Sequence, residues 1–239
     1  MKMKACLVIL IFVSAMFSIN GQSEEMTKGT KPLIDAGSAA RAAFDAHGGA
    51  KLKSIKSLVI KGGVDVTVQA QSLPGAFSTV ISGDKYILDI QTTFQSIKQT
   101  FDGTNTVSSL NGITLPPVTT LGFPLLPKFG DNGYVVSPVP AGKRKEKGFR
   151  LTAPDGFYTD FYLDEKTGLI SSYESAYEMN GRMFTTSIAV DKYRIVDGIT
   201  VPERYSQRFD LGPITAYANF KAKDILINSK IDDAVFGAK

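Results

Sequence analysis

The spacing of apolar residues along this chain has two periods, one helical and one extended. From Pro32 to about Ala46, alanines and Phe44 recur every three or four residues, and Gly48-Gly49 follows. This pattern predicts one amphipathic helix that ends before the glycines. Its apolar face is almost entirely alanine, so the helix can approach another surface closely but buries little apolar area. We therefore expect it to pack in the mouth of a larger element.

From residue 58 onward the apolar period changes to two, which is typical of half-buried β-strands. Turn signals such as Asp102-Gly103 and Asp197-Gly198 separate the stretches. Connections this short cannot make a parallel crossover, so the strands must pair antiparallel. An open sheet of ten or so strands tends to curl, and we expect a mainly β (α+β) fold with an incomplete barrel. The predicted strands are residues 58–70, 76–82, 85–91, 94–101, 104–110, 134–139, 148–153, 157–164, 169–178, 182–193, 201–209 and 214–225.

One face of this curled sheet is predicted to be rich in aromatic side chains. Ten or more strands with an alanine-faced helix leave interior volume, which favours a hollow that takes a hydrophobic ligand. The alternative is a plainly packed core, because buried aromatic residues are common in proteins. The predicted ligand-binding residues are Phe94, Phe101, Phe123, Phe129, Phe157, Phe161, Tyr173, Tyr177 and Phe209.

Residues 113–133 interrupt the strand pattern. Their four prolines preclude a regular strand or a long helix, and their apolar content is far above that of a solvated loop. Such a segment must cover something apolar, either as a mobile gate or as a short helix that seals one end of the sheet. Both arrangements place Phe123, Leu125, Leu126 and Phe129 over the concave face.

Residues 1–21 carry the pattern of a secretory signal peptide. Lys2 and Lys4 precede an apolar run at residues 5–17, and small or polar residues follow up to Gly21. The run is too short to span a bilayer, which needs about 20 apolar residues. The chain is therefore predicted to be exported.

We expect cleavage after Gly21, which would also remove Cys6, the one cysteine of the chain. A flexible lead-in would then occupy residues 22–31, and a single domain residues 32–239. Export alone leaves both the periplasm and secretion open. No lipid anchor is expected, because Cys6 lies at the start of the apolar run.

The rare residues exclude most site chemistry. One histidine and one cysteine cannot build a multi-histidine zinc site or a disulfide framework, so we expect no metal and no cofactor. His47 follows the predicted helix, where an imidazole can cap free carbonyls, and no G-x-S-x-G motif would support it in catalysis. We therefore expect no catalytic residue, although a carboxylate pair stays open.

The overall charge does not indicate a particular partner, but one local cluster of basic residues is notable. The formal net charge is +4, and two of the basic residues lie in the signal, so nucleic acid is not expected. Lys143, Arg144, Lys145 and Lys147 form a basic cluster. It is either an exposed hairpin tip or a transient contact with anionic headgroups or an envelope protein.

Four segments taken together resemble the LolA/LolB-like superfamily, the outer-membrane lipoprotein-sorting or periplasmic lipoprotein-carrier proteins. The resemblance covers roughly residues 34–236. The segments are Ala46-His47-Gly48-Gly49 with Leu52, Ile55 and Leu58; residues 161–170; Asp191-Lys192-Tyr193-Arg194 with Asp197-Gly198-Ile199 and Pro202; and Ile227-Asn228 with Ile231-Asp232-Asp233 and Phe236.

This resemblance implies an incomplete antiparallel barrel closed by helices, with an apolar hollow that holds acyl chains during transit across the periplasm. The partner would be a lipid or an acylated protein. The established carriers latch a lid with a basic residue of the sheet, for which Arg182, Arg204 and Arg208 are candidates. Non-catalytic carriage is our main hypothesis; a sensor or interaction domain of the envelope is the alternative, and a hydrolase is a third possibility.

Overall fold

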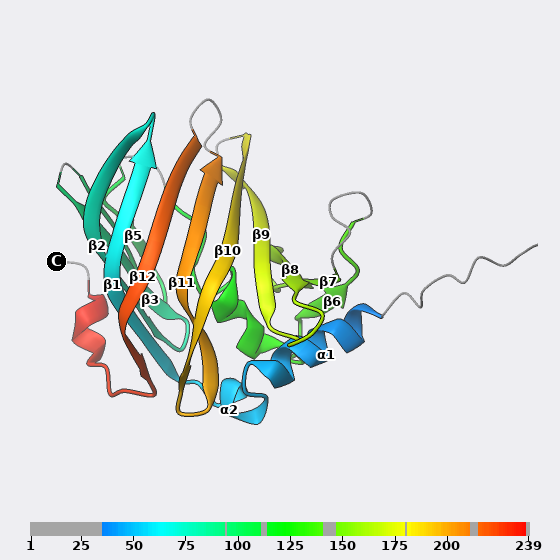
Figure 1. Cartoon of the computed structure of the whole chain (residues 1–239). Helices are drawn as coiled ribbons and strands as arrows, with labels where there is room; N and C mark the ends of the chain where they lie inside the picture. Colours follow the sequence, from blue (N-terminus) through cyan, green and yellow to red (C-terminus); the bar gives the residue numbers. More distant parts are fainter. Residues whose placement is uncertain are drawn as a thin grey trace, which may run out of the picture. The chain divides into compact units, whose positions relative to one another are not determined.

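In the computed structural model, the residues described are 35–93, 95–110, 114–140, 147–179, 181–210 and 215–237. Within these ranges, twelve β-strands form one sheet in which all strand pairs are antiparallel. The strands are β1 (Ser57–Val68), β2 (Gln71–Ser82), β3 (Lys85–Thr92), β4 (Ser96–Phe101), β5 (Thr106–Ser108), β6 (Val135–Ser137), β7 (Gly148–Thr152), β8 (Tyr158–Leu163), β9 (Ile170–Met179), β10 (Arg182–Val196), β11 (Ile199–Asp210) and β12 (Thr215–Ile227). The sheet is curled but does not close into a barrel, which confirms the predicted fold class (Figure 1).

The strand order places β5 and β6 at opposite edges of the sheet: β5-β4-β3-β2-β1-β12-β11-β10-β9-β8-β7-β6. The chain therefore builds one half from β1 outward to β5, crosses to the far edge, and returns through β6 to β12, which pairs with β1. The connection between β5 and β6 is the proline-rich part of the chain. We call its described residues, 114–134, the crossing segment.

The first hairpin was predicted wrongly. β1 ends at Val68, and Gln69 and Ala70 form its turn with positive φ values of 48° and 66°. Neither residue type favours this conformation, so the turn carries no local signal. Pro74 lies inside β2 opposite Asp65, beyond the last residue paired with β3. Proline is tolerated there because that side of the strand has no neighbour.

Bulges help the sheet to curl. The register between β1 and β12 shifts between Lys61 and Gly62, and a bulge bends a strand and increases its twist. At Gly62, an added Cβ would lie only 2.1 Å from the backbone oxygen of Lys221. Glycine is therefore required where these two backbones come together.

In the part of the chain that the structure describes, four short helices accompany the sheet: α1 (Ala36–Ala46), α2 (Ala50–Lys53), and the 3₁₀ helices η1 (Phe123–Lys128) and η2 (Asp233–Phe236). α1 begins at Ala36 rather than at Pro32, because Asp35 is its non-helical N-cap residue. Its buried face is four alanines and Phe44, and it packs on β6 and β7. None of the helices described for residues 35–237 is long and apolar enough to cross a membrane.

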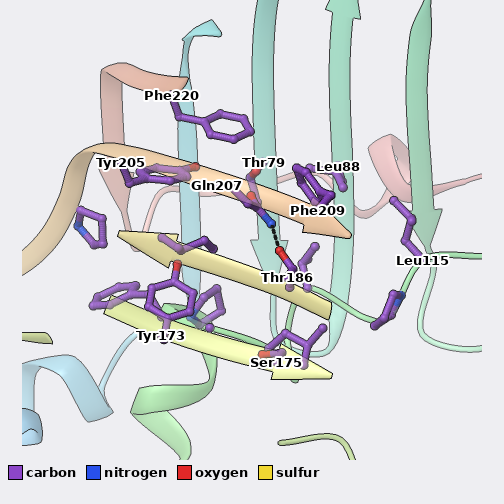
Figure 2. A pocket seen from close by; sticks show the side chains of 18 of the residues that line it. Thr79, Leu88, Leu115, Tyr173, Ser175, Thr186, Tyr205, Gln207, Phe209 and Phe220 are labelled. Carbon is purple, nitrogen blue, oxygen red and sulfur yellow. Dashed lines mark hydrogen bonds between the residues drawn. The ribbon is translucent and has the colours of Figure 1, made fainter. Parts of the chain in front are cut away.

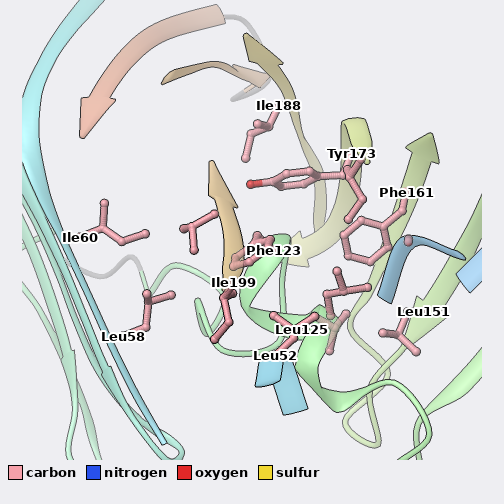
Figure 3. Close-up of a cluster of buried hydrophobic side chains, with 14 of the residues drawn as sticks. Leu52, Leu58, Ile60, Phe123, Leu125, Leu151, Phe161, Tyr173, Ile188 and Ile199 are labelled. Carbon is pink, nitrogen blue, oxygen red and sulfur yellow. The ribbon is translucent and has the colours of Figure 1, made fainter. Parts of the chain in front are cut away.

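A single apolar cluster joins the crossing segment to the sheet and the helices. Leu125 and Leu126 of η1 are completely buried, and Leu52 of α2 and Ile199 at the start of β11 belong to the same cluster. Figure 3 shows Phe123 and Leu125 among these side chains. One end of the concave face is therefore filled by the protein itself, so any free space must lie beyond η1.

Candidate functional site: an apolar cavity under the crossing segment

A cavity of about 180 Å³ lies between the concave face and the first part of the crossing segment. Its walls are contributed by β1, β2, β3, β9, β10, β11 and β12, and residues between 115 and 124 line it as well, so that it is only partly enclosed; we call residues 115–124 the cover. Tyr205 and Phe220 stack at 4.8 Å on one wall, and Thr79 and Leu88 stand on another (Figure 2). An engineered apolar cavity of about 150 Å³ stays dry and binds benzene. The free space is therefore sufficient for a small apolar group.

The cavity wall carries no charged side chain among its described residues. Its polar side chains are uncharged and come mainly from neighbouring strands: Ser175 on β9, Thr186 on β10 and Gln207 on β11. Burial raises the pKa of Tyr173 and of Tyr205, so both phenols stay neutral. The cavity can therefore bind apolar or neutral groups but offers no ion to a charged one.

The cover is attached at its first residue to the half of the sheet that contains β3 and β4. Gln99 of β4 is completely buried, and its amide makes two hydrogen bonds with the backbone of Leu115. The Gln99 Nε2 donates to the Leu115 oxygen at 2.8 Å, and the Leu115 N–H donates to Gln99 Oε1 at 2.7 Å. The Gln99 amide also donates to the Tyr86 hydroxyl at 2.7 Å, which orients it.

The other end of the cover is attached to the half that contains β8 and β9. The Gly122 N–H donates to Thr159 Oγ1 at 2.9 Å. Gly122 has a φ of +66°, and a Cβ there would lie 2.5 Å from the Tyr173 ring. Only glycine fits both the turn and this close approach. Residues 116–121 thus span the cavity between two attachment points.

Beyond η1, the crossing segment is held by the helices. Lys53 of α2 donates to the backbone oxygen of Phe129 at 2.8 Å and pairs with Asp131 at 2.6 Å. Arg41 of α1 lies over the Phe129 ring, 5.0 Å from its centroid, and Phe129 packs on Phe44 at 5.5 Å. These contacts hold η1 against the end of the sheet, whereas the cover itself is attached through neutral groups.

The sequence matches neither a protein-family model nor a curated protein. Solved structures match in fold. A LolA superfamily protein from Nitrosomonas europaea aligns with a TM-score of 0.52 at 11% identity, over 86% of this chain and 98% of that chain. A DUF1329 family protein from Desulfovibrio piger aligns with a TM-score of 0.50 at 8% identity, over 85% of this chain and 97% of that chain.

The chain has the LolA fold. The predicted resemblance is thereby confirmed at the level of the fold. Because identity is so low, the function of this LolA-fold protein must be argued from its own cavity.

The LolA-fold cavity brings together four of the nine predicted binding residues: Phe123, Tyr173, Tyr177 and Phe209. They come from the cover, from β9 and from β11, which are far apart in sequence. Their contact with a ligand stays a prediction.

The other predicted residues lie elsewhere or outside the described ranges. Phe161 is completely buried and stacks on Phe149 at 5.1 Å, so it supports the wall from behind Tyr173. Phe101 is half-buried against Tyr86 and Phe129 against Phe44. Phe157 is half-buried next to β8 and does not line the cavity. Phe94 lies outside the described residues, as do residues 1–34 with the predicted signal and lead-in.

The basic residues considered for a latch do not hold this cover. Arg204 and Arg208 are exposed, and Arg208 pairs with Asp210 at 2.9 Å. They alternate along β11 with Gln207 and Phe209, which line the cavity, so they face the convex side. The Arg182 side chain lies outside the described atoms. Gln99 and Thr159 attach the cover instead.

Sequence reasoning missed much of the cavity wall, including Ile60, Leu88, Ile188, Tyr205 and Gln207. The strand alternation placed Ile60 on the inner face, but no local signal separates a residue that lines a cavity from one that packs in the core. Gln207 could have been found as a polar residue between Tyr205 and Phe209, two inward aromatic positions of one strand.

His47 occupies the C-cap position of α1, but its side chain links the helix to the sheet instead of capping the helix carbonyls. Its ring is completely buried and lies between Phe123 and Tyr193, at 5.4 and 5.2 Å. The Ile170 N–H donates to Nε2 at 3.2 Å, so Nδ1 carries the proton and donates to the Thr200 oxygen at 2.6 Å. Burial lowers the pKa of His47 to about 4, and the bond to Thr200 opposes this. The neutral ring ties α1 to β9 and β11.

The ion pairs among the described residues lie away from the cavity. Arg150 forms a bidentate pair with the buried carboxylate of Asp160 at 2.6 and 2.8 Å and lies over the Tyr158 ring. Asp160 raises the pKa of Arg150 through this pair. Across the described residues, no group of three His, Cys, Asp or Glu side chains is placed to hold a metal ion.

Proposed function

We propose that this chain is an exported, non-catalytic carrier that shields an acyl chain of a lipid or lipoprotein. The observation that carries the proposal is the cavity itself, which is mainly apolar, has no charged side chain in its wall and is partly enclosed by the cover rather than by a regular layer of the sheet. Shielding a hydrocarbon chain from water needs apolar surface and no reacting group. The LolA fold supports this proposal but does not name the cargo.

The cavity of about 180 Å³ is smaller than the roughly 300–1,000 Å³ of pockets that enclose whole drug-sized ligands. A full acyl chain therefore requires the cover to move. Residues 116–121 can do so if the two hydrogen bonds between Gln99 and Leu115 break, at a cost of about 1–3 kcal/mol. Burying ten methylenes of an acyl chain contributes about 8 kcal/mol. This exceeds the cost of breaking the two hydrogen bonds, so binding of the acyl chain can displace the cover.

The place of action follows from the N-terminal pattern. A signal at residues 1–21 would export the domain at 32–239, and the periplasm is the compartment in which a lipid must cross water between two membranes. Contact with a membrane or an envelope protein would involve Lys143, Arg144, Lys145 and Lys147. Lys147 is half-buried, and the other three lie outside the described residues.

Mass spectrometry of organic extracts from protein purified without detergent tests the proposal. We expect acyl lipid in the wild-type extract, and Thr186→Phe should remove most of it because the new ring fills the cavity. The matched control is Thr185→Phe, which makes the same change at the neighbouring exposed position of β10 and should retain the lipid. Equal lipid in both variants, or none in the wild type, would overturn the proposal.

A transfer assay separates carriage from sensing. Donor vesicles containing a pyrene-labelled phospholipid are mixed with unlabelled acceptor vesicles, and the loss of pyrene excimer fluorescence is followed. A carrier speeds transfer in proportion to its concentration, and Thr186→Phe should abolish this effect. Lipid binding without transfer, combined with a stable complex with another envelope protein, would favour the sensor or interaction domain.

A further inference from the structure

A line of uncharged polar side chains crosses the concave face under the cover. Thr159, Ser175 and Thr186 stand on the adjacent strands β8, β9 and β10, and the Thr159 and Ser175 hydroxyls lie 3.0 Å apart. Gln207 on β11 continues the line, and its Nε2 donates to Thr186 Oγ1 at 2.9 Å (Figure 2). Polar groups are costly in an apolar wall unless they are hydrogen-bonded, so their arrangement indicates a specific use.

The hydrogen bonds determine which way the Gln207 amide points. The Thr186 hydroxyl donates to the Arg208 backbone oxygen at 3.0 Å, so it can only accept from Gln207. The amide nitrogen therefore faces Thr186, and the carbonyl oxygen Oε1 faces away from it. Within the described part of the chain, Gln207 Oε1 has no hydrogen-bond partner, although the side chain lines the cavity. It is an oriented acceptor that has no donor from the described residues and stays accessible to a ligand or to solvent.

Two inward aromatic residues, Tyr205 and Phe209, flank Gln207 on β11, and Ile188 stands opposite it on β10. A hydrocarbon chain can lie against these neighbours while a donor group meets Oε1. A carboxylate would meet this oxygen with the same sign of charge and would find no cation in the wall. An ammonium group would find no anion there. Both ions would lose their hydration without compensation.

We propose that Gln207 selects neutral amphiphiles, aliphatic chains with a hydroxyl or amide N–H that donates to its Oε1, over chains with ionised head groups. The inference rests on the proposed function and adds the class of ligand. Fatty alcohols and N-acylated amines share this chemistry. The two sources differ in the atom that donates, and the experiment includes one probe of each.

Displacement of the apolar dye 1-N-phenylnaphthylamine measures the selection with probes of equal chain length. The probes are 1-decanol, N-methyldecanamide, methyl decanoate, decanoate and decylammonium, at pH 8. The two donor probes should bind about fivefold more tightly than methyl decanoate, which lacks a donor. Decanoate and decylammonium should bind at least about tenfold more weakly than 1-decanol. If 1-decanol binds more tightly than N-methyldecanamide, fatty alcohols are the preferred ligands; the opposite order indicates N-acylated amines.

Gln207→Met tests the residue itself, because methionine keeps the approximate length of the side chain and loses the acceptor. We expect 1-decanol and methyl decanoate to bind this variant equally, while the dye still binds. Gln207→Glu should improve decylammonium binding relative to 1-decanol. Gln71→Met, at an exposed position of β2, is the control and should preserve the wild-type order.

The outcomes separate the two proposals. If neither the dye nor any probe binds, the proposed function fails. If all five probes displace the dye with similar affinity, or if decanoate binds best, the cavity binds chains without selection and this inference fails alone. The wild-type series needs no variant, so the inference can be overturned even if a substitution at Gln207 prevents folding.

Discussion

Lowering the pH from 7 to 5 should destabilise this protein through His47. The folded state holds the ring neutral with a pKa of about 4, against the ordinary value of 6.5 expected in the unfolded chain. Between these values the unfolded chain binds the additional proton, so stability is fully present above pH 6.5 and is lost as the pH falls towards 4. Each unit of pKa difference is worth about 1.36 kcal/mol, which amounts to about 3 kcal/mol in total and about 2 kcal/mol by pH 5.

The structural cause is that protonated Nε2 can no longer accept the Ile170 N–H, and the charge would lie between two aromatic rings. Urea unfolding followed by circular dichroism at pH 7, 6 and 5 measures the effect as a fall in midpoint at constant slope. His47 is the one histidine of the chain. Other side chains with ordinary pKa values titrate mainly outside the range from pH 5 to pH 7.

His47→Gln is the matched variant, because an amide can donate and accept but does not titrate. It should be less stable than the wild type at pH 7 and should lose little further stability between pH 7 and 5. The proton resonance of His47 Cε1–H in the folded wild type gives a second, direct reading and should stay constant down to about pH 5. An inflection near pH 6.5, or equal pH dependence in the two proteins, would refute the reasoning.

Three further substitutions test the cover and its support. Gly122→Ala should lower the free energy of unfolding by about 2 kcal/mol or more, because its Cβ meets the Tyr173 ring at a positive φ; an unchanged urea midpoint would contradict this. Gln99→Leu should cost about 2 kcal/mol, since both backbone groups of Leu115 lose their partner, and it should speed entry of 1-N-phenylnaphthylamine in stopped-flow mixing; slower entry would contradict the role given to this attachment. Phe161→Ala should cost about 3–5 kcal/mol in urea unfolding because the ring is completely buried, and a loss below about 1 kcal/mol would mean that the wall can collapse around it.

The errors in the sequence prediction have local causes. The hairpin at Gln69-Ala70 lacks the usual turn residues, so the first strand was extended too far and the second began too late. α1 begins at Ala36, although Pro32 suggested an earlier start. At the hairpin, strand pairing outweighs local propensity, because a strand that gains partners on the sheet tolerates an unfavourable turn.

The class of fold can be predicted from the strand periodicity alone. A period of two, repeated with short turns, leaves an antiparallel sheet as the one arrangement that satisfies the backbone, and a sheet of this size curls. The alternation also placed Tyr173 and Tyr177 on one face correctly. These features depend on near neighbours in the chain, which is why they can be predicted without coordinates.

The tertiary structure alone decided which inward residues line a cavity and which are packed. Phe161 and Tyr173 are indistinguishable by pattern, yet one lies behind the wall and the other forms it. The difference arises because β5 and β6 end at opposite edges, which sends the crossing segment over the concave face and attaches it through Gln99 and Thr159. A cavity forms where segments that are distant in sequence come together without filling the space between them. Its presence therefore cannot be predicted from any one segment.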